Sequence, residues 1–259
     1  MPKPAAPHLR ASPFTDRLPG PVFHRVEAVP ANGLYPEAAH DWGEFVYCHA
    51  GVTEVTAAGA RLLAPPHMGI WIPPGLAHTG SNREATEHCS VYVARDLCAA
   101  MPGRLCALVV TPLLRAILEE LRAVPWDGSA AQGRLLRVLA DQLSACRVAD
   151  SFVPDSADPQ LGALLAVLRA DPSDGRPLAE LARAHGMSER SLIRRCRRDL
   201  GMSLTEWRQR LRVVAAISRL QAGASVEAVA LDLGYSTASA FIAMFRGLTG
   251  ESPGRFVGR

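Results

Sequence analysis

The sequence of 259 residues has a single lysine, Lys3, and no apolar run close to the roughly 20 residues that a membrane helix requires. Its six cysteines include no Cys-x-x-Cys pair, which argues against a zinc knuckle. Most of them stand among apolar residues, as reduced cysteines in the cytosol do. Residues 1–13 are rich in proline and lack the apolar stretch of a signal peptide. We therefore expect a cytoplasmic globular protein without a membrane partner, with residues 1–20 as a loose tail.

Charge is unevenly distributed along the chain. From Gln160 onward there are 15 arginines and 9 acidic residues, a net charge of +6, whereas the preceding part carries 13 basic and 16 acidic residues, a net charge of −3. A basic half joined to a mildly acidic half indicates a polyanionic partner for the basic half. Nucleic acid is the polyanion that this pattern favours.

The periodicity of apolar residues divides the chain into three parts and predicts an α+β protein. Residues 21–110 contain short β-like runs separated by Gly, Pro and Asn, which is typical of a small sandwich or barrel, and we expect a β-barrel there. Residues 111–150 have helical spacing. A proline-containing linker over residues 151–160 then precedes an all-helical part over residues 161–259.

A leucine stripe in the central helical part predicts a homodimer contact within residues 131–147. Its members are Leu135, Leu136, Leu139 and Leu143. The opposite side of the same helix carries charged residues, as expected for an amphipathic helix. The alternative is that this stripe packs only on its own β-rich domain.

The C-terminal part contains the same pattern twice, 48 residues apart. The first copy is Leu181-Ala182 followed by His185-Gly186-Met187-Ser188, and the second is Val229-Ala230 followed by Leu233-Gly234-Tyr235-Ser236. A small residue lets two helices cross closely, glycine suits a tight turn with positive φ, and serine is a good N-cap for the next helix. The repeat therefore predicts two helix-turn-helix units. A long helix with its apolar stripe at Leu204, Trp207, Leu211, Val214 and Leu220 would join them.

The second helix of the first copy is strongly basic. Arg190, Arg194, Arg197 and Arg198 share one face, while Leu192, Cys196 and Leu200 lie on another. An isolated run of this kind is most often a solvated helix face. Directly after a helix-turn-helix turn, it indicates contact with DNA.

These residues make the C-terminal part resemble the DNA-binding domain of the AraC/XylS family of transcription regulators. The resemblance covers residues 160–256, with its matching stretches at residues 178–213 and 226–256, and includes the closing Gly-x-Ser-Pro-x-x-Phe motif, with Phe256 where tyrosine is commoner. It implies a sequence-specific regulator of transcription that binds double-stranded DNA, with RNA polymerase as a further partner. Arg190, Ile193 and Arg194 would read bases from the first recognition helix, and Ala238, Ser239 and Ala243 from the second. The full set that we expect at DNA also includes Ser188, Ser191, Arg197, Arg198, Ser236 and Arg246.

The β-rich part resembles a cupin barrel, which implies a sensor domain. The first cupin motif is traceable at His40, Glu44 and Gly51, and the second at Pro73, Gly75, His78 and Asn82. Two imidazoles and a carboxylate facing inward suit a divalent metal. Ala38 stands where metal-binding cupins have their first histidine, so only His40, Glu44 and His78 remain as candidate ligands. Three readings therefore stay open: a divalent metal site, a site for a small organic effector, and a barrel that has kept only its structural role.

Two other classes of protein fit less well. A cupin enzyme, such as a dioxygenase fused to a DNA-binding module, would require the full ligand set that Ala38 interrupts. An architectural DNA-bending protein would rarely carry an acidic sensor-like half. We therefore expect no enzymatic activity.

The location of the repeat and the charge split predict where DNA binding lies. A fragment of residues 160–259 should bind duplex DNA in a gel-shift titration, and its affinity should fall as salt rises because phosphate contacts release counterions. A fragment of residues 1–150 should not bind. Equal or stronger binding by the N-terminal fragment would contradict this assignment.

Overall fold

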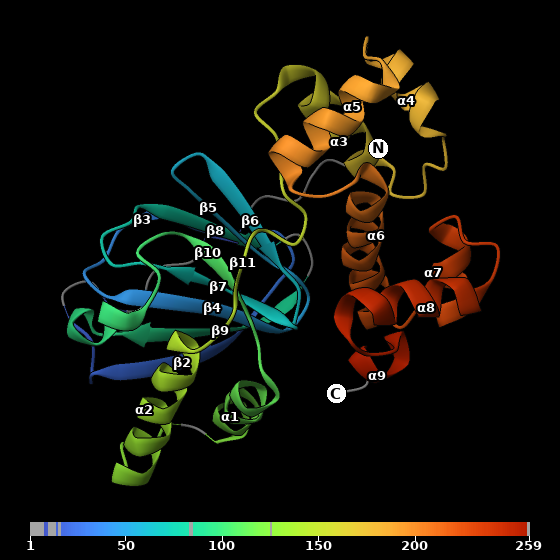
Figure 1. Cartoon of the computed structure of the whole chain (residues 1–259). Coiled ribbons are helices and arrows are strands. Elements are labelled where there is room, and N and C mark those ends of the chain that lie inside the picture. The colour runs from blue at the N-terminus through green and yellow to red at the C-terminus, as the bar shows by residue number, and fades with distance from the viewer. Residues whose placement is uncertain (1–7, 10–13, 15–16, 83–84, 125, 258–259) are drawn as a thin grey trace. The chain divides into compact units, whose positions relative to one another are not determined.

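The computed structural model describes residues 8–9, 14, 17–82, 85–124 and 126–257. The chain divides into two compact units, Met1–Phe152 and Val153–Arg259. The first holds the β-sheets with helices α1 and α2, and the second is helical (Figure 1). Most of the expected tail, residues 1–20, lies outside the described residues; within it, His8–Leu9 form the short strand β1, which pairs in parallel with β3.

Two sheets make up the β-rich part of the first unit. The five-stranded sheet has the order β1-β3-β8-β5-β6, and the six-stranded sheet has the order β11-β10-β7-β4-β9-β2. Apart from β1, the strands of the first sheet are β3 (Gly33–Ala38), β8 (His78–Asn82), β5 (Thr53–Ala57) and β6 (Ala60–Ala64). Those of the second are β11 (Val148–Ala149), β10 (Cys106–Val109), β7 (Met68–Ile72), β4 (Gly43–Ala50), β9 (Thr86–Val93) and β2 (Val22–Val29).

The expected barrel is wrong, because the two sheets do not close on each other. Over the described residues, no ladder joins the β1 or β6 edge of one sheet to the β11 or β2 edge of the other. Short alternating strands separated by turn residues predict β-structure equally well for a closed barrel and for two open sheets. Closure depends on pairing between strands distant in sequence, which the local pattern does not encode.

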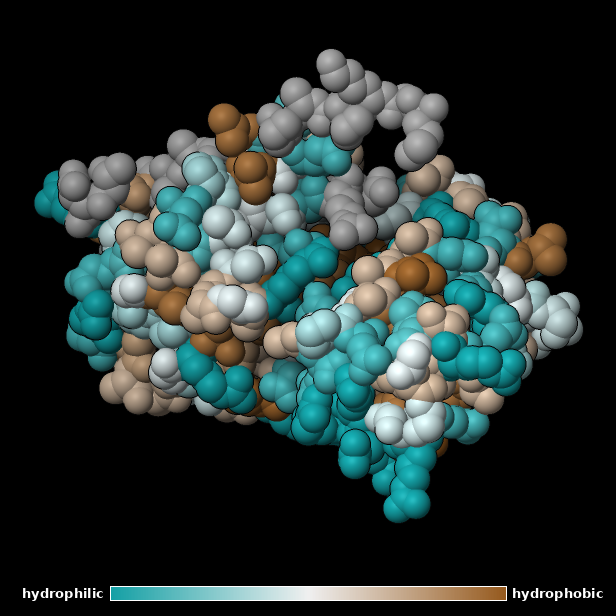
Figure 2. Space-filling view, turned by 90° about the horizontal axis from the view of Figure 1, so that it is seen from above, coloured by the Kyte–Doolittle hydropathy of each residue, from teal (hydrophilic) through white to brown (hydrophobic). Residues whose placement is uncertain are grey.

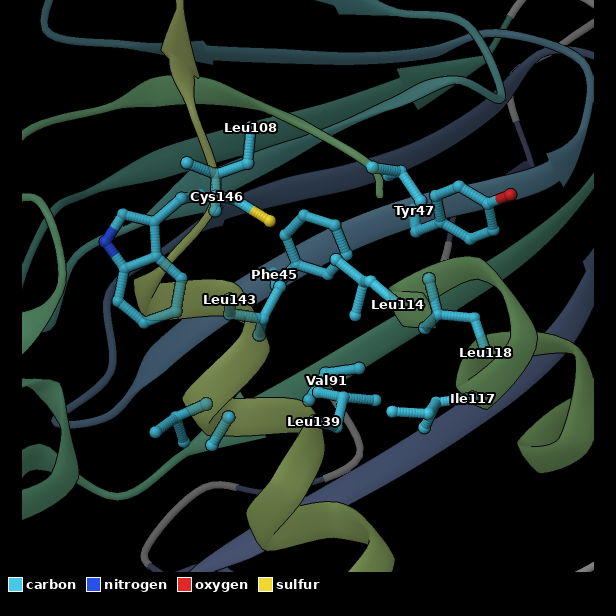
Figure 3. Close-up of a cluster of buried hydrophobic side chains, with 14 of the residues drawn as sticks. Phe45, Tyr47, Val91, Leu108, Leu114, Ile117, Leu118, Leu139, Leu143 and Cys146 are labelled. Atoms are coloured by element: carbon cyan, nitrogen blue, oxygen red, sulfur yellow. The ribbon is translucent and has the colours of Figure 1, made fainter. Parts of the chain in front are cut away.

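The central strands β4, β7 and β9 of the six-stranded sheet are largely buried, and successive residues of a strand point to opposite faces. Phe45 and Tyr47 of β4 and Val91 of β9 point toward helices α1 (Pro112–Ala123) and α2 (Ala130–Ser144), as Figure 3 shows. The intervening residues, among them Glu44 and Ser90, line a cavity on the other face. The same strands therefore build a core and a cavity from alternate positions.

The leucine stripe of residues 135–143 belongs to this core. Leu136, Leu139 and Leu143 are fully buried against their own sheet, and Leu135 is partly buried against the same cluster (Figure 3). The stripe is therefore not available as the dimer contact that its sequence predicted. Hydrophobic spacing identified the buried face of α2 correctly but could not tell which partner covers it, because both partners require the same pattern.

The second unit contains two small helical bundles joined by the long helix α6 (Leu204–Gln221). The first bundle consists of α3 (Pro159–Ala170), α4 (Leu178–Ala184), α5 (Glu189–Arg195) and a π-helical turn over Cys196–Leu200. The second consists of α7 (Val226–Asp232), α8 (Ala238–Thr249) and α9 (Pro253–Val257). Leu204, Trp207, Leu211 and Leu220 of α6 are buried as expected, but Val213 rather than Val214 completes the buried face. None of the helices in the described ranges combines the length and apolar character needed to span a bilayer.

The segment predicted as a linker is bonded to the second unit over much of its length. Trp207 donates its indole N–H to the carbonyl of Pro154 at 2.8 Å. The hydroxyl of Ser156 lies 2.6 Å from a carboxylate oxygen of Asp199. Asp158 caps the N-terminus of α3 through the amides of Gln160 and Leu161. Residues 154–158 therefore form part of the first helical bundle.

The burial of α2 gives a test of which face of this helix stabilises the fold. Leu139→Ala removes a fully buried side chain and should lower the free energy of unfolding by about 2–5 kcal/mol. Val138→Ala, on the exposed side of the same helix, is the matched control and should change it by less than about 0.5 kcal/mol. Thermal and urea unfolding followed by circular dichroism would measure both. Equal effects of the two substitutions would contradict the packing of α2 described above.

Candidate nucleic-acid interface and ligand cavity

The two predicted helix-turn-helix turns have the same backbone geometry. Gly186 and Gly234 adopt positive φ values of 66° and 80°. In the first turn the amide of Met187 donates to the carbonyl of Ala182 at 2.9 Å, and in the second the amide of Tyr235 donates to that of Ala230, also at 2.9 Å. Both alanines are buried, which lets the paired helices approach closely. The repeat seen in the sequence is therefore a repeat in structure.

The two second helices begin differently. Ser188 caps α5 as expected, since its hydroxyl accepts from the amide of Ser191. Helix α8 is capped by Thr237, whose hydroxyl accepts from the amide of Ala240, and not by Ser236. The expected cap at Ser236 is wrong because both residues are good caps, and the second turn is one residue longer than the first.

Helix α5 and the π-helical turn that follows it expose several of the residues expected at DNA. Arg190, Ile193, Arg194 and Arg197 are exposed, whereas Leu192, Cys196 and Leu200 are buried. Arg190, Arg194 and Arg197 form no ion pair with any residue that the structure describes. Ser188 and Ser191 are joined hydroxyl to hydroxyl at 3.0 Å, so both are engaged in the cap. The free guanidinium groups of this face are suited to bases and phosphates.

Two other arginines of the same helical segment are held by carboxylates. Arg195 pairs with Asp158, and Arg198 contacts both Asp158 and Asp199. Hydrogen bonds from Arg198 and Ser156 lower the pKa of Asp199 to about 2. The expectation that Arg198 is a DNA contact therefore has to allow for two competing carboxylates, one from the predicted linker and one from its own turn. Sequence spacing placed Arg198 beside Arg194 but gave no sign of these partners.

Helix α8 exposes a nearly uncharged face. Ser239, Ala243 and Arg246 are exposed and Ala238 is half-buried, while Phe241 and Phe245 point into the second bundle. Ser236 is exposed in the turn that precedes this helix. Of the residues expected at DNA in this bundle, only Arg246 carries a charge, and it lies in the last turn of the helix.

A cavity opens between the two sheets of the first unit. Its volume is about 90 Å³, which is room for several water molecules or a small ligand. Its polar lining includes Arg25, Tyr35, His40, Glu44, His78, His88 and Ser90. The apolar part of the cavity wall includes Val46, Val55 and Ile72.

The three residues predicted as ligands meet in this cavity. The ligand atoms of His40, Glu44 and His78 all lie within 4.8 Å of one another. The Nε2 atom of His40 lies 3.1 Å from Glu44 Oε2, and that of His78 lies 3.7 Å from the same oxygen. Burial alone would raise the pKa of Glu44, but hydrogen bonds from His40, His78 and Ser90 outweigh it and lower the pKa. Burial lowers the pKa of His78, but the contact with Glu44 outweighs it and raises the pKa overall.

The backbone fixes how the two imidazoles face the carboxylate. Nδ1 of His40 lies 2.8 Å from the carbonyl of Trp42, and Nδ1 of His78 lies 2.9 Å from that of Leu76. A carbonyl can only accept, so each Nδ1 carries a proton, and in the neutral ring the lone pair lies on Nε2. Two lone pairs would then face the oxygen of Glu44, which is unfavourable unless a proton or a metal ion lies between them. The donor set thus fits a divalent cation, with both imidazoles oriented in the way that metal-ligating histidines are.

Two neighbours of these ligands complete the site. Ala38 lies directly across from His78 in the β3–β8 ladder and lines the same cavity. His88, to which the sequence pattern assigned no role, also lines the cavity, with Nε2 2.9 Å from the hydroxyl of Ser90 and its ring stacked on Tyr35. The signal was present as the alternation of His88 and Ser90 with apolar residues along β9, which marks a polar face.

The N-terminal and C-terminal parts of the chain each match a known protein family. Residues 20–139 match the AraC-like ligand binding domain, and residues 181–259 match a helix-turn-helix domain. The first match covers the cavity with His40, Glu44 and His78. The second covers α5, α6 and α8.

The chain is also similar to individual transcriptional regulators. The chain is 30% identical over 226 residues to the HTH-type transcriptional regulator NimR of Escherichia coli K12, covering 86% of this chain and 82% of NimR. It is 32% identical over 152 residues to a putative AraC-like transcription regulator of Streptomyces antibioticus, covering 55% of this chain and 50% of that protein. The structure of ToxT from Vibrio cholerae with bound unsaturated fatty acid has a TM-score of 0.39 and 11% identity, covering 91% of this chain and 94% of ToxT. The chain belongs to the AraC family of helix-turn-helix transcriptional regulators, with a ligand-binding domain before its DNA-binding domain.

Proposed function

We propose that this regulator reads two adjacent segments of the DNA major groove, one through α5 and one through α8. The observation that supports the proposal is the repeated turn geometry, which presents an exposed face of each second helix from one helical unit. Two recognition helices joined by one long helix can reach successive major grooves on one side of a duplex, about 34 Å apart. Basic residues around them supply the phosphate contacts.

The two helices differ in what they offer to base edges. Arg190 and Arg194 of α5 can each bond guanine through two hydrogen bonds, which gives strong discrimination. Ala238, Ser239 and Ala243 of α8 offer one hydroxyl and methyl groups, which discriminate weakly. Arg246 is suited to a phosphate. The half-site under α5 should therefore be sharply specified and the half-site under α8 loosely specified.

Substitutions in the two helices should separate these roles. Arg194→Ala should cost about 1–3 kcal/mol on a site selected by the wild-type protein and relax preference at one or two base pairs. Ser239→Ala should cost much less, and Arg246→Ala should weaken binding to all sequences alike. Selection from a random duplex pool followed by titration would measure all three. A stronger consensus that follows changes in α8 rather than α5 would contradict the assignment.

For the first unit, we propose that the cavity is the effector site and that His40, Glu44 and His78 hold a divalent metal ion in it. Support comes from the orientation of both Nε2 atoms toward one carboxylate oxygen. Three protein ligands leave a coordination position open. A bound ion would supply a Lewis-acid centre for an oxygen or nitrogen ligand, and Arg25, Tyr35 and His88 would surround such a molecule.

The position of Ala38 makes this metal proposal testable. Ala38→His should add an imidazole beside His78 and raise the affinity for Zn²⁺ or Mn²⁺, while His78→Ala should lower it by about tenfold or more. Ser81→Ala, which changes another cavity residue, is the control and should leave metal affinity unchanged. Isothermal titration calorimetry on the folded variants measures the effect. If His78→Ala binds metal as well as the wild type does, the cavity instead takes an organic effector or only supports the fold.

A homodimer and a contact with RNA polymerase are further proposals for this chain. Since the leucine stripe is buried, a dimer contact on α2 would have to use its outer face around Val138.

On the face of the molecule shown in Figure 2, hydrophobic side chains occur singly or in small groups among hydrophilic ones. Exposed Leu231 on α7 is one apolar residue available to a protein partner of the second unit.

A further inference from the structure

Two arginines one turn apart on α6 bind the same loop by their guanidinium groups. The loop is residues 171–176, which connects α3 to α4 in the first bundle. Arg208 donates to the carbonyl of Arg176 at 3.0 Å and also to that of Asp174. Arg212 donates to the carbonyl of Pro172 at 2.9 Å and to that of Asp174 at 3.3 Å.

The second helix-turn-helix turn meets this loop at the same place. The guanidinium carbon of Arg212 lies 5.3 Å from the ring centre of Tyr235, within the range of a cation–π contact. Gly234 approaches the loop so closely that a Cβ atom there would lie 3.0 Å from the carbonyl oxygen of Ser173. Arg208, Arg212, Tyr235 and residues 171–176 form what we call the arginine hub. It connects the first bundle, the long helix and the turn that leads into α8.

Joining helices through the charged arginines of the hub carries a desolvation cost. Burial, together with the neighbouring charge of Arg212, lowers the pKa of Arg208. The guanidinium groups of both arginines donate hydrogen bonds to neutral carbonyls, and the adjacent Asp174 carboxylate is paired with Arg176 at 2.7 Å. Apolar side chains would join the elements at lower cost, but they lack directionality. A guanidinium fork bonded to several fixed carbonyls defines an angle as well as a distance.

We propose that Arg212, supported by Arg208, is a positioning residue that sets the placement of α8 relative to α5 and thereby the spacing of the two DNA half-sites. The inference rests on the proposed reading of one duplex by both helices. If Arg212 merely added stability, its loss would lower the melting temperature without changing the geometry between the helices. A distance between the helices, measured without DNA, distinguishes these roles and does not depend on the proposed function.

The first experiment uses the full chain with spin labels at Glu189 on α5 and Ala240 on α8, both of which are exposed. The labels are attached through a ketone-bearing amino acid because the chain has six cysteines. Double electron–electron resonance should give one narrow distance distribution for the wild type. Arg212→Ala and Tyr235→Leu should broaden or shift it. Arg219→Ala is the control on the same helix, because the ion pair of Arg219 at 3.4 Å joins α6 to Asp232 of the second bundle.

Folding is checked by circular dichroism for each variant, and Arg212→Lys serves as a milder second variant. Lysine keeps the positive charge and the aliphatic chain but lacks the planar guanidinium group, so this substitution should also broaden the distance distribution. A wild-type distribution in folded Arg212→Ala, Arg212→Lys and Tyr235→Leu would overturn the proposal. An equally broad distance distribution in Arg219→Ala and Arg212→Ala would also overturn the proposal, since any substitution on α6 would then have the same effect.

The second experiment measures affinity for a duplex selected by the wild-type protein, with and without five base pairs inserted between its two halves. The insertion turns one half-site about half a helical turn away from the other. Wild type and Arg219→Ala should lose about tenfold or more in affinity, which is about 1.4 kcal/mol, and Arg212→Ala should lose much less. Equal losses in all three proteins contradict the proposal. A wild type indifferent to the insertion contradicts reading by both helices, while the distance measurement still decides the role of the hub.

Discussion

The first unit depends on the alternation of side chains along the strands of its six-stranded sheet. Because neighbouring residues point to opposite faces, each of β4 and β9 can be half core and half cavity. Phe45 and Val91 pack against the helices, while Glu44 and Ser90 face the ligand space. The rigid packing on one face thus holds the polar groups on the other at fixed positions, which a preformed ligand site requires.

In the second unit, two small helical bundles share the long helix α6. The buried face of α6, with Trp207 fully enclosed, gives both bundles a common core element. Apolar burial is not directional, so it holds the bundles together without fixing their angle. The hydrogen bonds of Arg208 and Arg212 to a single loop supply the directional part.

Much of this could be predicted from the sequence, for physical reasons that also set the limit. The repeat around Gly186 and Gly234 was decisive because a tight turn with positive φ admits few residues. His40, Glu44 and His78 were predicted as ligands from the resemblance to the cupin motifs, not from the spacing of residues alone. What the sequence did not predict depends on contacts between distant segments: open sheets instead of a barrel, the partner of the α2 leucines, and the carboxylates that hold Arg195 and Arg198.

The arginines of α5 and its π-helical turn show how such contacts divide residues that look alike in sequence. Arg190 and Arg194 have no acidic partner among the described residues, so binding a phosphate or a guanine costs them no existing ion pair. Arg198 would have to break its ion pairs with Asp158 and Asp199 before it could bind DNA. Exposed ion pairs of this kind are individually weak. Asp158 also caps α3, so its position is fixed by the backbone whether or not DNA is bound. Asp158 and Asp199 thus keep Arg195 and Arg198 occupied, whereas the guanidinium groups of Arg190 and Arg194 lie exposed on α5 without an acidic partner among the described residues.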